Sequence, residues 1–208
     1  MSFNMTTLAV VLALLVVAGT GWKMSSRSAY ESAGFQLVSK QGAFEIRDYP
    51  ALPMAVTDMA FAKSAGNGSF QRLFRYISGS NNRRQKIAMT TPVFMDPEQG
   101  DASGQMSFVL PAGLSPTGGP EPTEPRVRLA KRPAGRFAVL RFSGRITEQS
   151  TGEMESRLRH WMADNGLIPE GPAGFAGYDP PWIPGVFRLN EVLIRITADH
   201  GQTATGLR

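Results

Sequence analysis

Two amphipathic helical segments, each set among short strand-like runs, constrain the fold of this chain more than any other feature of its sequence. The first segment spans residues 67–78 and carries apolar side chains at i, i+3, i+4 and i+7, the spacing of one helix face. These side chains are Phe70, Leu73, Phe74 and Ile77. The second segment spans residues 149–165, and its apolar face carries Met154, Leu158, Trp161 and Met162. A glycine follows each segment, as expected where a helix ends.

Short runs rich in β-branched and aromatic residues surround both helical segments and predict strands. Before the first helix they are residues 35–39, 43–49 and 54–61, and after it 86–95 and 105–110. The second helix is preceded by residues 127–130 and 137–142 and followed by 175–178 and 191–197. The sequence therefore predicts an α+β fold in which two similar β-rich halves, each with one helix, share one core.

Length and composition agree with a single folded domain plus a terminal segment. The chain has 208 residues, of which 42% are hydrophobic and 19% are charged, and its formal net charge is +5. It contains no cysteine, which excludes disulfides, thiolate metal sites and thiolate-ligated haem. No basic stretch is interleaved with aromatic residues, so we expect no nucleic-acid partner.

The first 24 residues predict a membrane anchor or a signal segment. Residues 8–18 are unbroken apolar sequence, and the run from Phe3 to Trp22 reaches about 20 residues, the length that crosses a bilayer. A cleaved signal peptide and a buried helix are the alternatives, although the basic start of a signal peptide is missing. Because Lys23 and Arg27 follow the run and no basic residue precedes it, we expect a cytoplasmic rather than a periplasmic domain. The predicted organisation is an anchor at 1–24, a linker at 25–34, the domain at 35–198 and a disordered tail at 199–208.

Six segments, in order along the chain, resemble the SOUL haem-binding protein family. They are residues 44–50 (FEIRDYP), 77–81 (ISGSN), 86–93 (KIAMTTPV), 108–111 (FVLP), 178–182 (YDPPW) and 190–192 (NEV). The resemblance implies a distorted antiparallel β-barrel of two pseudo-symmetric halves flanked by two helices. It also implies a non-enzymatic carrier or buffer of haem or another tetrapyrrole.

By the same resemblance, the binding groove would lie along the first helix and the adjoining strand. A flat apolar ligand with carboxylates on one edge needs an apolar surface and cations at its rim. The candidate apolar contacts are Phe70, Leu73, Phe74, Ile77 and Met89. The candidate partners for haem propionates are Arg72, Arg75 and Lys86. An apolar stripe at helical spacing also serves a core, and surface arginines also face solvent, so packing and solvation are the competing interpretations.

Axial ligation of haem iron by histidine is not expected. Some family members have a proposed iron ligand at the position where this chain has Asp48, a poor ligand for haem. His160 lies off the apolar face of the second helix, and His200 lies in the polar tail. We therefore predict haem binding that is mainly hydrophobic or recruits Met or Tyr, and no separate metal site.

Two other functions remain open at the level of sequence. Glu191, with Tyr178, is a candidate polar or catalytic group of a hydrolase or small-molecule sensor that uses the same cavity, if burial raises its pKa toward neutral. Glu191 is equally a satisfied structural acceptor, and no recognisable catalytic set supports a reaction. The third possibility is a protein or lipid interaction module with a vestigial cavity. Trp182 is expected to pack at a core edge.

Overall fold

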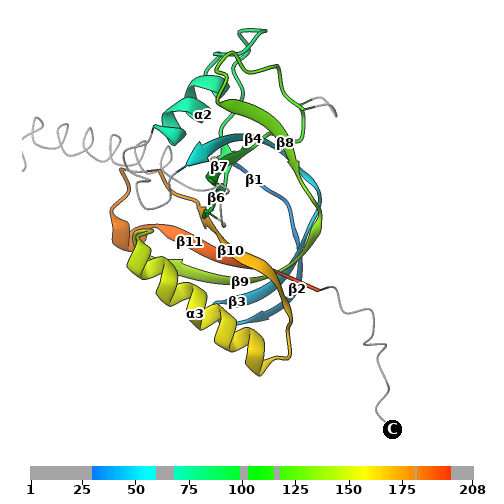
Figure 1. Ribbon diagram of the computed structural model, residues 1–208, viewed down its shortest axis with the longest axis vertical. Helices are drawn as coiled ribbons and strands as arrows, with labels where there is room; N and C mark the ends of the chain where they lie inside the picture. The colour runs from blue at the N-terminus through cyan, green and yellow to red at the C-terminus, as the bar shows by residue number, and fades with distance from the viewer. Residues whose placement is uncertain (1–29, 60–67, 99–102, 115–117, 181, 198–208) are drawn as a thin grey trace, which may run out of the picture.

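The computed structural model describes residues 30–59, 68–98, 103–114, 118–180 and 182–197, which form two α-helices and an extensive sheet (Figure 1). In chain order the strands before the second helix are β1 (Glu31–Ser32), β2 (Gln36–Gln41), β3 (Phe44–Tyr49), β4 (Leu52–Met59), β5 (Thr90–Thr91), β6 (Val93–Asp96), β7 (Gly104–Val109), β8 (Val127–Arg132) and β9 (Gly135–Ser143). The remaining strands are β10 (Pro169–Gly177) and β11 (Leu189–Ile196). The helices are α2 (Ser69–Ile77), α3 (Glu148–Asp164) and the short 3₁₀ helix η3 (Gly185–Phe187).

In the described chain, nine strands form one sheet in the order β2-β3-β9-β11-β10-β6-β7-β4-β8, with antiparallel pairing throughout. The order repeats in the two halves. Within this sheet, the strand before each helix and the next two strands after it are neighbours. They are β6-β7-β4 for α2 and β10-β11-β9 for α3. The halves also exchange a strand, since β3 pairs with β9 of the second half and β8 pairs with β4 of the first.

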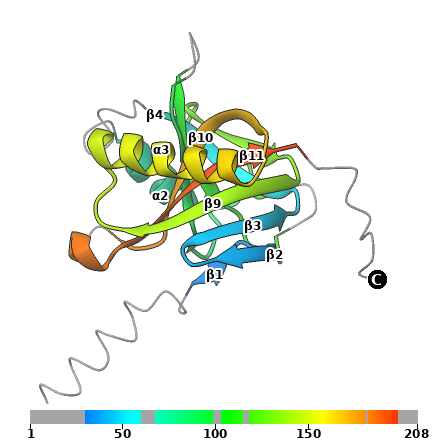
Figure 2. The same cartoon turned by 90° about the horizontal axis from the view of Figure 1, so that it is seen from below.

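Both helices pack on the same face of the sheet. Leu73, Tyr76 and Ile77 of α2 pack with Phe108 in one cluster, and Leu158 of α3 lies in another. Half-buried Met95 of β6 contacts both clusters and so lies between them. Figure 1 shows α2 and α3 at opposite ends of the sheet, and Figure 2 shows α3 lying across β9, β10 and β11.

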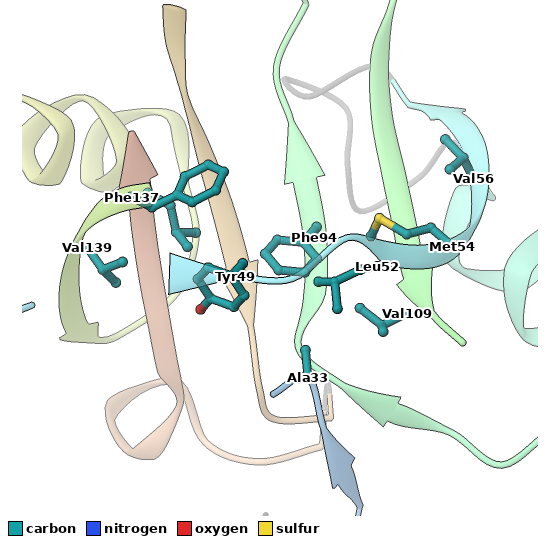
Figure 3. Packing of buried hydrophobic residues seen from close by; sticks show 11 residues of the cluster. Ala33, Tyr49, Leu52, Met54, Val56, Phe94, Val109, Phe137 and Val139 are labelled. Carbon is teal, nitrogen blue, oxygen red and sulfur yellow. The ribbon is translucent and has the colours of Figure 1, made fainter. Parts of the chain in front are cut away.

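The opposite face of the sheet, which we call the inner face, encloses a third cluster because the sheet curls upon itself. Tyr49, Phe94 and Phe137 meet there from β3, β6 and β9, and the side chains converge between the two halves (Figure 3). Phe94 is 1% exposed and Val139 is fully buried, so this cluster is true core rather than an open channel. The side chains of β3 alternate between the two faces of the sheet. Glu45, Arg47 and Tyr49 point to the inner face, while Phe44 and Ile46 pack toward α3.

The expectation of a distorted antiparallel β-barrel is wrong in one respect, because the sheet stays open with β2 and β8 as its edges. All six residues of β2 are exposed and its register shifts between Leu37 and Ser39, while β8 carries Arg128, Lys131 and Arg132. Irregular and charged edge strands discourage further pairing, which accounts for the open edges.

Local signals fix the two helices where the sequence predicts them. The Thr147 hydroxyl accepts from the amide of Ser150, and the Ser150 hydroxyl accepts from the amide of Thr147, so a capping box begins α3. Helix α2 has no side-chain cap and begins after Gly68, whose φ of 71° lies in the left-handed region that glycine tolerates.

Several predicted boundaries differ from those observed. The predicted strand at 86–95 is two strands separated by Pro92, and β10 begins at Pro169, six residues before the predicted start at 175. Ala33 is buried and β1 pairs with β5, so residues 31–33 of the predicted linker are part of the fold. The predicted anchor at 1–24 and the tail at 199–208 lie outside the described residues. Among the helices that are described, none has both the length and the apolar character needed to cross a bilayer.

Candidate functional site

Helix α2 presents an exposed aromatic surface beside the core. Phe74 is 50% exposed, and its ring stacks on that of half-buried Phe70 with centroids 6.0 Å apart and planes at 12°. Phe70 in turn meets buried Phe108 edge-on at 5.3 Å. The Phe70–Phe74 stack therefore rests on the buried core at Phe108 and is exposed to solvent at Phe74. An exposed aromatic surface of this kind suits a flat apolar ligand.

The other predicted apolar positions lie deeper. Leu73 is fully buried and Ile77 is 5% exposed, and both belong to the core between α2 and the sheet. Met89 is half-buried and packs against the same core. Of the predicted apolar set, the structure brings Phe70, Phe74 and Met89 within reach of the surface and places Leu73 and Ile77 in packing.

The three predicted cations differ in their surroundings. Arg72 is 6% exposed, and its guanidinium donates to Oγ1 of Thr57 at 2.9 Å and to the carbonyl of Asp58 at 2.7 Å. Burial, followed by the charge of Arg126, lowers the pKa of Arg72. These contacts attach α2 to β4. Binding of a ligand carboxylate by Arg72 stays a prediction. Arg75 and Lys86 are exposed, and Arg75 forms a distant ion pair with Glu124 at 4.0 Å.

Two buried polar residues shape this surface, although sequence reasoning did not single them out. Tyr76 donates from its hydroxyl to the carbonyl of Pro120 at 2.9 Å, and burial, with the charge of Glu121, raises its pKa to about 12. A side chain at Gly119 would clash, because its Cβ would lie 2.4 Å from the Tyr76 hydroxyl. Asn81 donates to the carbonyls of Tyr76 and Gln85, so it fixes the loop that carries Lys86. The only sequence feature that pointed to either residue was the position of Asn81 in the ISGSN segment.

The expectation that histidine does not ligate haem iron stays a prediction, and the structure describes the surroundings of Asp48 and His160. Both oxygens of Asp48 accept from Arg136 at 2.7 Å, and this hydrogen-bonded pair lowers the pKa of Asp48, so its carboxylate is engaged. His160 is exposed on α3, as predicted, and its Nδ1 lies 2.7 Å from the carbonyl of Ser156. Among the described residues, no group of three His, Asp or Glu side chains is placed to hold a metal ion. His200 lies outside them.

A second arrangement of polar residues lies on the inner face. The guanidinium of Arg47, 1% exposed, donates to both carboxylate oxygens of Glu191 at 2.9 and 2.8 Å. Its Nε donates to Glu45 at 2.7 Å, and its Cζ lies 4.1 Å from the ring centroid of Phe35. Burial opposes ionisation of Glu45, but hydrogen bonds from Lys40 and Arg47 outweigh it and lower the pKa of Glu45.

Two tyrosines complete this network. Tyr178 donates to Oε2 of Glu191 at 2.8 Å, and Tyr49 accepts from Arg47 at 2.9 Å. Burial, followed by the negative charge of Glu191, raises the pKa of Tyr178. Tyr178 and Glu191, which the sequence suggests as a candidate catalytic pair, are in contact, and catalysis by them stays a prediction. Arg47 was visible only as part of the FEIRDYP segment, and its partnership with Glu191 is a tertiary contact across 144 residues.

The network resembles a structural clamp more than a catalytic site. Both oxygens of Glu191 already accept short hydrogen bonds, and a general base needs a free oxygen within reach of a substrate proton. The interpretation of Glu191 as a satisfied structural acceptor therefore fits the geometry.

Comparison with known proteins places these features in a family. Residues 30–195 match the family described as SOUL heme-binding protein. Human Heme-binding protein 2 is 31% identical over 183 residues, covering 83% of this chain and 82% of that protein. Heme-binding protein 1 of Xenopus laevis is 26% identical over 158 residues, covering 72% of this chain and 82% of that protein.

The solved structure of a hydrolase from Listeria innocua has the same fold. Its TM-score is 0.53 at 10% identity, covering 77% of this chain and 94% of that one, which is a likeness of fold alone. Membership of the family rests instead on the family match and on the human relative. The match begins before β1 and ends one residue before the end of β11. The chain belongs to the SOUL heme-binding protein family.

Proposed function

We propose that this domain binds haem or another tetrapyrrole without catalysing a reaction, and that it serves transport, buffering or delivery at a membrane. Membership of the SOUL heme-binding protein family is the observation that carries the proposal. The relatives from human and Xenopus laevis are both named as heme-binding proteins, which supports the same ligand class here.

The exposed Phe70–Phe74 stack on α2 is the proposed contact surface. A porphyrin face laid on Phe74 would cover a large aromatic side chain that is 50% exposed, which is favourable by roughly 25 cal/mol per Å² of apolar area removed from water. Arg75 and Lys86 are exposed nearby in the chain and would pair with the propionates through charge-assisted hydrogen bonds.

The residues present fit a tetrapyrrole held by its face and its carboxylates. When bound, haem supplies an iron centre whose ligation sets its redox chemistry. On this surface the half-buried Met89 is the candidate donor, and His160 lies on the other helix. The protein's own contribution is an apolar platform with a cationic rim, which suits reversible carriage.

Catalysis by Glu191 is the alternative that the geometry supports less. A substrate would have to displace Arg47 or Tyr178 from the carboxylate before Glu191 accepted a proton. The relatives that establish the family are named for binding, which also favours a binding protein.

Membrane attachment is the second part of the proposal. The apolar run from Phe3 to Trp22 supports an anchor. The turn around η3 supports a second contact with lipid, because Trp182, Val186 and Phe187 are 69%, 72% and 69% exposed there. This exposure also shows that the expected packing of Trp182 against the core is wrong.

A haem titration followed by Soret absorbance tests the ligand and its site. The fragment from Ser25 onward, checked for folding by circular dichroism, should give a saturable, red-shifted band. Phe74→Asp should weaken binding by about tenfold or more, because a charge would replace the exposed ring of the stack. Phe187→Asp removes an aromatic residue that is even more exposed, at 69%, and lies away from α2, so it should leave the titration unchanged. A folded fragment without a saturable band would exclude haem, and equal effects of both variants would exclude the α2 surface.

A further inference from the structure

A cleft of about 360 Å³ opens on the inner face of the sheet, where β8 turns into β9 and β10 begins. Its volume lies within the range of small-molecule pockets, roughly 300–1,000 Å³. Phe137 and Leu193, which are 5% and 2% exposed, belong to the inner cluster and contribute small apolar areas to the wall of the cleft, whereas α2 packs on the other face of the sheet. The cleft is therefore separated by the sheet from the surface proposed for the tetrapyrrole.

Arg132 is a mostly buried cation with unused donors in this cleft. Its side chain is 18% exposed, and its Cζ lies 4.4 Å from the ring centroid of Phe94 and 5.4 Å from that of Phe137. Within the described residues its guanidinium makes one long contact, with Asp96 at 3.6 Å, and this weak hydrogen-bonded ion pair partly offsets the burial that raises the pKa of Asp96. A guanidinium that lies on an aromatic ring keeps its N–H edge available for a planar anion.

Arg195 and Gly174 also line the cleft that contains Arg132. Arg195 donates to the carbonyls of Ala134 and Pro133 at 3.0 and 3.1 Å, and its Cζ lies 4.9 Å from the Phe137 centroid. Gly174 lines the cleft without a side chain, and a Cβ there would lie 2.6 Å from Oδ1 of Asp96. The glycine thus keeps both the cleft and the Asp96 carboxylate in their present positions.

The charges of the cleft restrict the class of ligand. Arg132 and Arg195 supply two cations, and Asp96 and Glu170 supply two carboxylates. A dianion such as phosphate would meet repulsion from the nearby Asp96, whereas a single carboxylate matches the guanidinium fork at lower cost. The walls contributed by Phe137 and Leu193 favour an apolar, planar remainder.

We propose that this cleft is a second binding site, for a small aromatic carboxylate whose carboxylate group pairs with Arg132 and whose ring rests on Phe137 and Leu193. The site is independent of tetrapyrrole binding on α2, because it lies on the opposite face of the sheet and shares none of the residues proposed there. Asp96 and Glu170 would accept hydrogen bonds from any hydroxyl or amine on the ligand.

Equilibrium dialysis of the full-length chain in detergent against 2-naphthoate tests the site, with 2-naphthamide as the uncharged probe of the same shape. The wild type should bind the acid and not the amide. Arg132→Gln should weaken binding by about tenfold or more, since it removes a charged hydrogen-bond partner. Arg128→Gln removes the same charge from an exposed position on the same strand and should have no effect, and neither should Phe74→Asp. Absence of binding by a folded wild type, or equal binding of acid and amide, would overturn the proposal.

Photolabelling of the unmodified chain gives a second readout that does not depend on how a variant folds. The photoreactive carboxylate 4-benzoylbenzoate should label a peptide containing Phe137 or Leu193, and excess 2-naphthoate should suppress the label. Label on a peptide from α2 instead would show that aromatic carboxylates bind the tetrapyrrole surface and would refute a separate site.

Discussion

The guanidinium of Arg47 on β3 holds both carboxylate oxygens of Glu191 on β11, at 2.9 and 2.8 Å. The two residues lie 144 positions apart and belong to different halves of the fold. Because β3 is the strand that the first half contributes beside β9 of the second, the ion pair reinforces the exchange of strands between the halves. The pair is almost fully buried, so removing one partner has consequences that a surface pair would not have.

We expect Arg47→Met to destabilise the domain by about 3 kcal/mol or more, because two buried carboxylates, Glu45 and Glu191, would lose the buried partner that they share and keep only less buried cations, Lys40 and Arg141. Urea denaturation followed by circular dichroism measures the change in the free energy of unfolding. Arg136→Met is the matched control, since Arg136 pairs with Asp48 between strands β9 and β3 at roughly one-third exposure. That variant should cost less than about 1 kcal/mol.

The double variant Arg47→Met, Glu191→Leu distinguishes the effect of an unpaired buried charge on stability from the effect of lost packing. It should be more stable than Arg47→Met alone, because no uncompensated charge remains at position 191. A double variant as unstable as the sum of the two single ones would contradict strong coupling between these residues.

The stability of the domain should depend on pH through Glu45. The pKa of Glu45 in the folded state lies below its ordinary value of 4.5, so the ionised carboxylate contributes stability above that pH. This contribution is lost as the pH falls through the folded-state pKa. We therefore expect the stability difference between wild type and Glu45→Gln to be largest above about pH 5 and to shrink below it. Urea denaturation at a series of pH values checks this, and a difference that grows on acidification would show that the direction is wrong.

Arg72 and Arg75, on the same helix, should respond to substitution in opposite ways. Arg72→Met leaves Thr57 and the Asp58 carbonyl without their donor, so we expect a loss of about 1–3 kcal/mol in stability and unchanged haem affinity per folded molecule. Arg75→Met should change stability by less than about 0.5 kcal/mol and weaken haem binding. Urea denaturation and Soret titration on both variants measure the two effects. Weaker haem binding by folded Arg72→Met would instead support the predicted contact with a propionate.

Local pattern was enough to predict the two helices and most strands. The helical spacing of Phe70 to Ile77 and that of Met154 to Met162 are properties of short segments, and both helices appear as expected. The early part of β10 has the sequence PEGPAG, whose prolines and glycines are typical of loops, and it becomes a strand only because β11 pairs with it.

Tertiary contacts account for what the sequence did not reveal. An apolar stripe at helical spacing does not distinguish Phe74, which faces out, from Leu73, which faces the core, because both lie within one broad face. The unused donors of Arg132 depend on Phe94, Phe137 and Asp96, which come from separate strands. Sheet closure was inferred from the resemblance, yet it depends on whether the edges meet, and here β2 and β8 remain apart.

The turn around η3 gives a final prediction about the membrane. Trp182, Val186 and Phe187 expose large apolar side chains, and the orange turn projects from the body of the domain in both views (Figures 1 and 2). Arg145 packs beneath Gly185, whose Cβ would lie 2.8 Å from its Cγ, so a cation accompanies the apolar group. Exposed tryptophan with neighbouring basic residues suits the interface of an anionic bilayer.

Because the chain has no cysteine, one introduced thiol reports on one position. The full-length Trp182→Cys variant, labelled with an environment-sensitive nitrobenzoxadiazole dye, should show blue-shifted emission and protection from iodide in vesicles of phosphatidylcholine and phosphatidylglycerol. Lys131→Cys, at an exposed position on edge strand β8, is the control and should stay accessible to iodide. If the label at position 182 is as accessible to iodide as the control label, the turn faces water and the proposed lipid contact around η3 is wrong.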